Sequence, residues 1–88
     1  MRLLIYLRGG ALKETDFAVL VREIRNRLEL TQEKFAAKLG VSFPSISRWE
    51  NGRTAPSPLA LQRIEQMLRE MGQNGRDLLS KYFPDPSP

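Results

Sequence analysis

Apolar residues recur with helical spacing along residues 16–28, and polar residues fill most of the positions between them. Successive apolar positions lie three, one, three and four residues apart, which places them along one face of a helix. They are Phe17, Leu20, Val21, Ile24 and Leu28. The pattern predicts a helix over residues 16–28, with Thr15 or Asp16 as its N-cap because either side chain can accept a hydrogen bond from a backbone N–H group.

A second, shorter helix is expected to start at Thr31, whose hydroxyl group can accept an early backbone N–H. Gly40 ends this helix, since glycine readily adopts the left-handed conformation that often closes a helix. The inward-facing residues of this helix are Phe35, Ala36 and Leu39.

A third helix follows only two residues later, with Ser42 as its N-cap. Pro44 is tolerated in the first turn, where backbone N–H groups have no partner within the helix. Ile46 and Trp49 are three residues apart and should face inward, and Asn51 with Gly52 stops the helix.

A fourth helix is predicted to start at Ser57 and Pro58, because serine caps helices and proline is favoured at the first helical position. Gly72 ends it, and residues 76–83 are expected to form a last short helix before a frayed, Pro-rich end at residues 84–88. The inward positions of the two helices are Leu61, Ile64, Leu68 and Met71, followed by Leu78, Leu79, Tyr82 and Phe83.

The N-terminal residues do not continue this helical pattern. Residues 3–7 are apolar and precede two glycines, which is typical of a short strand and a turn. A single strand needs a partner. Two partners remain open: a copy of the strand across a two-fold axis, or the last helix of the same chain.

We therefore expect an all-α fold of four to five helices with a short extended segment at its N-terminus. The predicted organisation is an N-terminal extended segment over residues 1–15, which is a candidate dimerisation strand, a helical domain over residues 16–72, and a short helix and tail over residues 73–88. At 88 residues, one small core is the most that the chain can build.

The composition excludes most enzymatic chemistry. The chain has no Cys and no His, which rules out disulfides, thiol nucleophiles, imidazole bases and almost all zinc sites. The remaining carboxylates, lysines, tyrosines and serines form no catalytic pattern. We expect no enzyme activity, no metal and no small-molecule cofactor.

The charge balance suits a polyanionic partner. The net charge is +4 and the isoelectric point is near 10.0. Residues 31–55 hold four cations and two anions, so the basic excess includes the two short helices. The longest apolar run, residues 3–7, is far too short to span a membrane, and we expect a cytoplasmic protein with no membrane partner.

Residues 31–51 carry the functional signal. Two short helices joined by a Gly-Val-Ser turn and flanked by longer helices let the second short helix project from the surface. This layout needs a small residue where the helices cross, a glycine in the turn and apolar residues beneath the projecting helix. Ala36, Gly40, Val41, Ile46 and Trp49 meet these needs.

Several motifs are spaced as in one known family. They are Arg22 and Arg25, Leu-Thr-Gln at 30–32, Phe-Ala at 35–36, Leu-Gly-Val-Ser at 39–42, Ile-Ser-Arg-Trp-Glu-Asn-Gly at 46–52, and Pro56. Through them, residues 20–68 resemble the lambda-repressor-like helix-turn-helix family, the phage repressor and Cro class. The resemblance covers more than half of the chain and implies a DNA-binding domain.

The resemblance also implies roles for single residues. Phe43, Pro44 and Arg48 match the family's base-facing positions, with Ser47 assisting. The positions that commonly lie near DNA phosphates in the family are matched by Thr31, Gln32, Asn51, Arg53 and Thr54. Gln32 is also expected to steady the recognition helix. Arg25 and Glu50 match a buried ion pair that ties the first helix to the end of the third. Each polar residue has a plainer interpretation as a solvated surface side chain, whereas Trp49 is expected in the core.

Phe43 and Pro44 depart from the family's usual pattern, in which side chains at these positions can form hydrogen bonds with base edges. Phe43 can contact only apolar surface, such as a thymine methyl group, and Pro44 has no side-chain donor. Direct readout would then rest mainly on Arg48, assisted by Ser45 or Ser47, and DNA shape could supply further discrimination.

Three functions remain open. The first is a repressor that binds operator DNA as a two-fold homodimer, with residues 43–51 in the major groove and half-sites one helical turn or a multiple apart. The second is an antitoxin that represses its own operon and binds a toxin through its terminal segments. The third is a protein-interaction adaptor, for which the apolar pair Phe43 and Pro44 would suit a protein surface.

Overall fold

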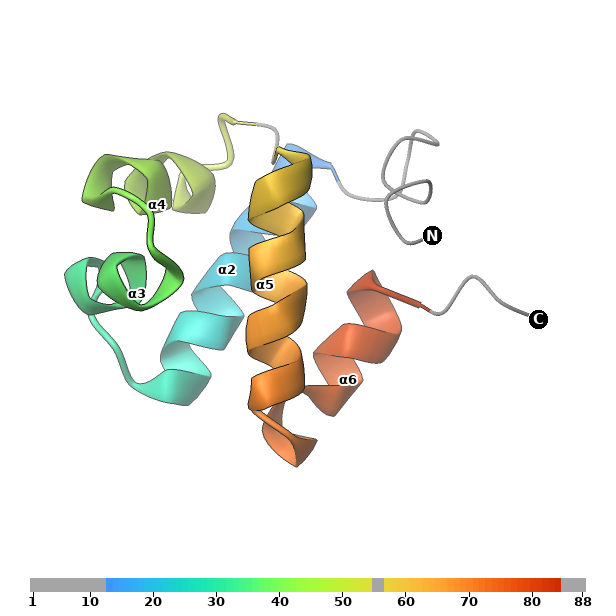
Figure 1. The fold of residues 1–88 in the computed structure, drawn as a ribbon. Helices are drawn as coiled ribbons and strands as arrows, with labels where there is room; N and C mark the ends of the chain where they lie inside the picture. Colours follow the sequence, from blue (N-terminus) through green and yellow to red (C-terminus); the bar gives the residue numbers. More distant parts are fainter. Residues whose placement is uncertain (1–12, 55–56, 85–88) are drawn as a thin grey trace. The chain divides into compact units, whose positions relative to one another are not determined.

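The computed structural model describes residues 13–54 and 57–84, which form five α-helices and no strand (Figure 1). The helices are α2 (Glu14–Leu28), α3 (Gln32–Leu39), α4 (Phe43–Glu50), α5 (Pro58–Glu70) and α6 (Gln73–Tyr82). The expected all-α class is therefore confirmed. The strand predicted over residues 3–7 and the end of the Pro-rich tail lie outside the described residues.

The helices belong to two compact units, one with α2, α3 and α4 and the other with α5 and α6. In the first unit, α4 packs against both α2 and α3. In the second unit, α5 packs against α6. The two short helices of the functional signal therefore lie in one unit together with the long helix that precedes them.

Helix α2 begins at Glu14, two residues before the predicted start. The prediction that Thr15 or Asp16 caps the helix is therefore wrong, because both residues lie inside its first turn. Acidic side chains in a first turn are stabilised by the free N–H groups and the positive end of the helix dipole, which favours the earlier start. The predicted apolar face is buried at Phe17, Leu20, Val21 and Ile24, whereas Leu28 is only half-buried.

Helix α3 has the ends that the sequence predicts. The Thr31 hydroxyl accepts the backbone N–H of Lys34 at 3.2 Å. Gly40 is left-handed, with a φ of 77°, and the N–H of Val41 turns back to the carbonyl of Ala36 at 3.0 Å. These bonds satisfy backbone groups at both ends and fix the tight turn into α4.

Helix α4 also begins and ends as expected. Ser42 Oγ accepts the N–H of Ser45 at 3.2 Å, and Asn51 follows the last helical residue. Ile46 is fully buried and Trp49 is 8% exposed. The Trp49 ring meets the ring of Phe17 edge-on, with centroids 5.2 Å apart, so this contact joins α4 to α2.

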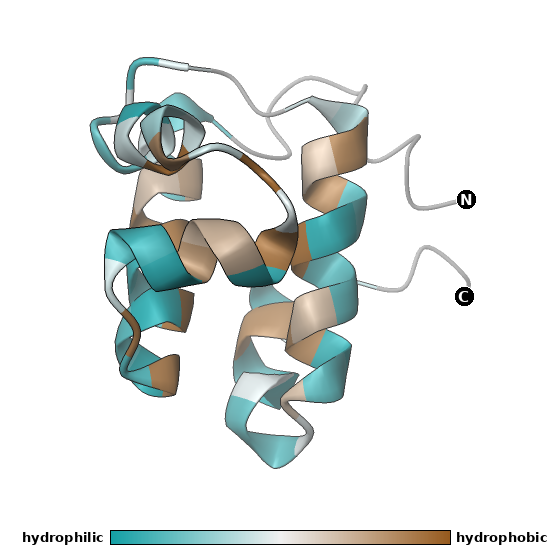
Figure 2. Ribbon diagram, turned by 60° about the vertical axis from the view of Figure 1, so that its left-hand side comes forward, coloured by the Kyte–Doolittle hydropathy of each residue, from teal (hydrophilic) through white to brown (hydrophobic). Residues whose placement is uncertain are grey.

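In the other unit, the predicted cap of α5 is confirmed, since Ser57 Oγ accepts the N–H of Ala60 at 3.1 Å. Apolar and polar residues alternate along this helix in Figure 2, as expected of an amphipathic helix. Leu61, Ile64 and Leu68 are buried as predicted. Met71 is only half-buried, because the helix ends at Glu70 and leaves Met71 as its C-cap; Met67 is buried instead.

Helix α6 begins at Gln73, three residues before the predicted start. The earlier start places Gly75 inside the helix, where glycine is usually unfavourable. Here Gly75 is buried, and a Cβ at this position would overlap the carbonyl oxygen of Leu68. The close approach of α6 to the end of α5 therefore accounts for the glycine at this position.

Candidate nucleic-acid interface

Helix α4 buries one face and presents the other to solvent. Ile46 and Trp49 are buried, whereas Phe43 is 47% exposed and Pro44 and Arg48 are also exposed. The predicted base-facing residues thus share the outward part of α4, with Ser47 half-buried beside them. None of the ion pairs among the described residues involves Arg48.

The C-terminal end of α4 is held by its last residue. The Glu50 side chain is only 6% exposed and forms an ion pair with Arg25, as the resemblance implied. Arg25 Nε donates to Glu50 Oε2 at 2.6 Å, and Arg25 Nη2 donates to Oε1 at 2.9 Å. Two parallel bonds of this kind fix the relative orientation of both side chains.

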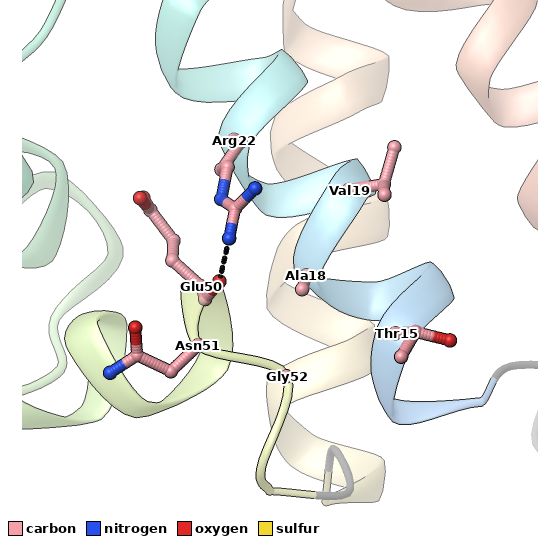
Figure 3. Close-up of a pocket in the computed structure, with 7 residues that line it drawn as sticks. All are labelled: Thr15, Ala18, Val19, Arg22, Glu50, Asn51 and Gly52. Carbon is pink, nitrogen blue, oxygen red and sulfur yellow. Dashed lines mark hydrogen bonds between the residues drawn. The ribbon is translucent and has the colours of Figure 1, made fainter.

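Gln32 and Arg22 complete the set around Glu50. Gln32 Nε2 donates to Glu50 Oε1 at 3.0 Å, which joins the start of α3 to the end of α4. Arg22 Nη2 donates to the main-chain carbonyl of Glu50, as Figure 3 shows, and so satisfies a carbonyl at the end of the helix. We call Glu50, Arg22, Arg25 and Gln32 the Glu50 cluster.

The surroundings of Glu50 keep its carboxyl group ionised. Burial raises the pKa of Glu50, but hydrogen bonds from Arg25 and Gln32 and the charges of Arg25 and Arg22 lower it by more. The net pKa therefore lies below the ordinary range of a glutamate. The hydrogen bond to Glu50 in turn raises the pKa of Arg25. The end of α4 is thus fixed by a pair that remains charged at neutral pH.

The predicted phosphate-contacting residues surround α4 in sequence, and they differ in how much of each side chain remains available. Thr31, Asn51 and Arg53 are exposed, and Gln32 and Thr54 are half-buried. The Thr31 oxygen already accepts the N–H of Lys34, although its own proton is available to a phosphate. Gln32 uses one N–H for Glu50 and keeps the other.

Arg22 is the residue whose role sequence reasoning missed. The sequence indicates it only as one of the residues that carry the family resemblance. In the structure it binds the end of α4, and it lines an open pocket of about 210 Å³ with Thr15, Ala18, Val19, Glu50, Asn51 and Gly52 (Figure 3). Its position three residues before Arg25, on the same side of α2, is the signal that could have placed it near Glu50.

The described part of the chain contains neither a cluster of metal-ligating side chains nor a helix that could span a membrane. No group of three or more acidic side chains there is placed to hold a metal ion. None of the described helices is long and apolar enough to cross a membrane.

Comparison with known proteins assigns the region to a family. Residues 21–70 match the model of a helix-turn-helix family. An uncharacterised HTH-type transcriptional regulator of Methanothermobacter thermautotrophicus is 43% identical over 64 residues, which are 73% of this chain and 84% of that protein.

Longer proteins also contain a similar region. A type II methyltransferase of Lactococcus lactis subsp. cremoris is 40% identical over 53 residues, and one of Shigella sonnei is 38% identical over 52 residues. These matches cover 57% and 56% of this chain but only 14% of each methyltransferase. No solved structure matches the chain significantly.

Proposed function

Because the chain belongs to the lambda-repressor-like helix-turn-helix family of DNA-binding regulators, we propose that it is a repressor that places residues 43–51 in the major groove of operator DNA. The observation that carries this proposal is the two-sided character of α4. Ile46 and Trp49 fix the inner face in the core, while Phe43, Pro44 and Arg48 remain outside. Repression follows from occupancy, since a protein bound at an operator blocks access of polymerase.

The Glu50 cluster supports the proposal because a helix that recognises bases must be held in a fixed orientation. Glu50 is tied to α2 through Arg25 and Arg22 and to α3 through Gln32. These bonds hold the end of α4 while leaving its first turn and Arg48 exposed. A rigidly supported recognition helix loses little conformational entropy on binding.

We assign the contacts to two classes. Arg48 donates to a base edge, where its guanidinium can bind guanine in a bidentate manner. Thr31, Gln32, Asn51, Arg53 and Thr54 contact the phosphate backbone and set the position of α4 along the groove. The protein binds as a homodimer, with half-sites about 34–36 Å or a multiple apart.

Selection of bound sites from random DNA duplexes tests the proposal. We expect a palindromic site whose half-site spacing gives the distance between the two recognition helices. Binding should weaken as the salt concentration rises, because bound cations of the protein release counterions from DNA. An adaptor that binds only proteins would enrich no DNA sequence and would show no salt-sensitive association with DNA. This result would refute the proposed repressor function.

Three variants separate the two classes of contact. Arg48→Ala should weaken binding to the selected site by roughly 1–3 kcal/mol and relax preference at one base pair in each half-site. Gln32→Ala and Arg53→Ala should weaken selected and random duplexes by similar factors, because phosphates carry no sequence information. Arg53→Ala should also reduce the log–log salt slope by about one unit, whereas the uncharged Gln32 should leave it nearly unchanged.

Arg76→Ala is the matched control for the removal of one exposed positive charge. Arg76 lies in α6, outside the motif, and its loss should change neither base preference nor affinity for the selected site substantially. If Arg48→Ala weakens every duplex equally, Arg48 contacts phosphate and the assignment to a base edge is wrong.

A further inference from the structure

We infer that the first turn of α4 recognises the C5-methyl group of a pyrimidine, through the rings of Phe43 and Pro44. This inference rests on the proposed placement of α4 in the major groove and specifies what its first turn contacts there. The group recognised is chemical rather than a particular base, because thymine and 5-methylcytosine carry the same methyl at the same ring position.

The polar side chains of this turn are already bound to each other. Ser42 Oγ accepts the backbone N–H of Ser45, and the two hydroxyl oxygens lie 2.9 Å apart in a hydrogen bond. That bond uses one of the two hydroxyl protons, so a single proton of the pair remains for an external acceptor. Pro44 offers no donor at all. The turn therefore has little capacity to form hydrogen bonds with a base edge.

The exposed surface of the turn is instead apolar. Phe43 is 47% exposed, whereas Ile46 and Trp49 of the same helix are buried. Of the three large apolar residues that are exposed in the described part of the chain, Val19, Phe43 and Leu59, only Phe43 lies on α4. On a recognition helix, an aromatic ring exposed in this way can contact apolar groups of the DNA but can form no hydrogen bond with a base edge.

The major groove offers one apolar group at its base edges, the C5-methyl of a pyrimidine. Arg48 lies four residues after Pro44 and thus one helical turn further along the same side of α4. A methyl-bearing pyrimidine near the first turn and a guanine near Arg48 would together use this side of the helix. In this arrangement the methyl group faces the apolar rings of Phe43 and Pro44, and the acceptors of guanine face the guanidinium of Arg48.

Phe43 and Pro44 cannot distinguish thymine from 5-methylcytosine by hydrogen bonding. The two bases differ in the groove because thymine presents an acceptor and cytosine a donor, but neither ring can engage these groups. We therefore expect 5-methylcytosine to be bound better than cytosine at the contacted position. Methylation of the DNA would then strengthen binding at a site whose sequence is unchanged.

The experiment replaces single bases in the selected duplex. At each pyrimidine of the half-site, thymine is compared with uracil and cytosine with 5-methylcytosine, so that each pair differs by one methyl group. For the wild-type protein we expect loss of the methyl at one position to weaken binding about fourfold per half-site, which corresponds to the burial of one methyl group.

Protein variants assign this effect to the ring. Phe43→Ala should remove most of the difference between the methylated and unmethylated base, and Pro44 accounts for what remains. Phe43→Leu should retain more of it than Phe43→Ala, because leucine keeps a larger apolar surface. Leu59→Ala is the matched control, since Leu59 is 58% exposed but lies on α5, and it should retain the full difference. Circular dichroism checks that each variant is folded.

The outcomes separate this inference from the proposed function. A methyl effect that Phe43→Ala reduces supports the inference, and the base that shows it, thymine, 5-methylcytosine or both, identifies the source of the methyl group. If no methyl matters, or if Phe43→Ala retains the full effect, the inference fails while DNA binding stands. If the wild-type protein binds no duplex in a salt-dependent manner, the proposed function fails and the inference fails with it.

Discussion

Arg25 and Arg27 provide a matched test of how burial sets the strength of an ion pair in this protein. Both lie in α2, their side chains are 22% and 23% exposed, and each uses Nε to bind a glutamate. The partners differ, because Glu50 is 6% exposed and Glu23 is 46% exposed. A buried charge that loses its partner retains its desolvation cost, so Arg25→Ala should destabilise the protein far more than Arg27→Ala.

The expected magnitudes follow from these exposures. Arg25→Ala leaves the Glu50 carboxylate buried with the Gln32 bond, and breaking such a pair costs about 3–5 kcal/mol. We expect a value near the lower end, because Arg25 itself is partly exposed. The pair between Arg27 and Glu23 joins neighbouring turns of a helix, and its loss in Arg27→Ala should contribute less than about 1 kcal/mol. Glu50→Ala should cost less than Arg25→Ala, since the freed guanidinium can still reach solvent and the carbonyl of Leu30.

Urea unfolding followed by circular dichroism measures these differences in the free energy of unfolding. For a domain with a total stability of about 5–15 kcal/mol, a loss of this size leaves a folded population that can be titrated. If Arg25→Ala and Arg27→Ala lower the free energy of unfolding equally, burial of Glu50 does not determine the strength of the pair and the argument is refuted.

The pH dependence provides an independent check on the same pair. In the wild-type protein the folded-state pKa of Glu50 is depressed, so the pair contributes fully above the ordinary glutamate pKa of about 4.3 and its contribution is lost as the pH falls through the folded value. In Arg25→Ala, protonation relieves the cost of a buried unpaired carboxylate. The difference between the two proteins should therefore shrink on acidification; a constant difference from pH 7 to pH 3 would contradict the assignment.

Two further pairs of substitutions test the packing. Trp49→Ala should lower the free energy of unfolding by about 3–5 kcal/mol, because its ring is buried against Phe17. Phe43→Ala should change it by less than about 1 kcal/mol, because Phe43 lies on the exposed face of α4. Equal losses in urea unfolding would contradict the assignment of a buried and an exposed face to α4. Gly75→Ala should lower the free energy of unfolding by about 1–3 kcal/mol, because the new Cβ overlaps the Leu68 carbonyl. Ser80→Ala, at an exposed position of α6, is the control and should be nearly neutral. If Gly75→Ala leaves the melting temperature unchanged, α6 does not approach the end of α5 this closely.

The helix ends that sequence reasoning predicted correctly are those set by local bonds. Thr31, Ser42 and Ser57 each accept an N–H from the residue three positions later, and Gly40 supplies a left-handed turn. Such contacts involve residues within one turn of the chain, so the identity of the capping residue is nearly sufficient to predict them.

The starts of α2 and α6 depend on more than one residue type and were predicted less well. Thr15 and Asp16 suit either a cap or a first turn, and only the start at Glu14 decides between them. Gly75 weakens the helical pattern locally, yet its packing against the end of α5 favours a helix there. Tertiary contacts outweigh intrinsic propensity at such positions, and a single sequence does not contain them.

The Glu50 cluster shows why a site can be predicted in part. The family resemblance pairs Arg25 with Glu50, but the partner of Gln32 lies 18 residues away and is fixed only by the packing of α3 on α4. An ionised carboxylate accepts hydrogen bonds and donates none, so Glu50 requires the amino group of the Gln32 amide to face it. The second N–H of the Gln32 amide is then left for a phosphate. Its orientation is set by the hydrogen bond to Glu50 at the end of the recognition helix. The residue that stabilises α4 therefore also positions the proposed phosphate contact, which couples the stability of this unit to its affinity for DNA.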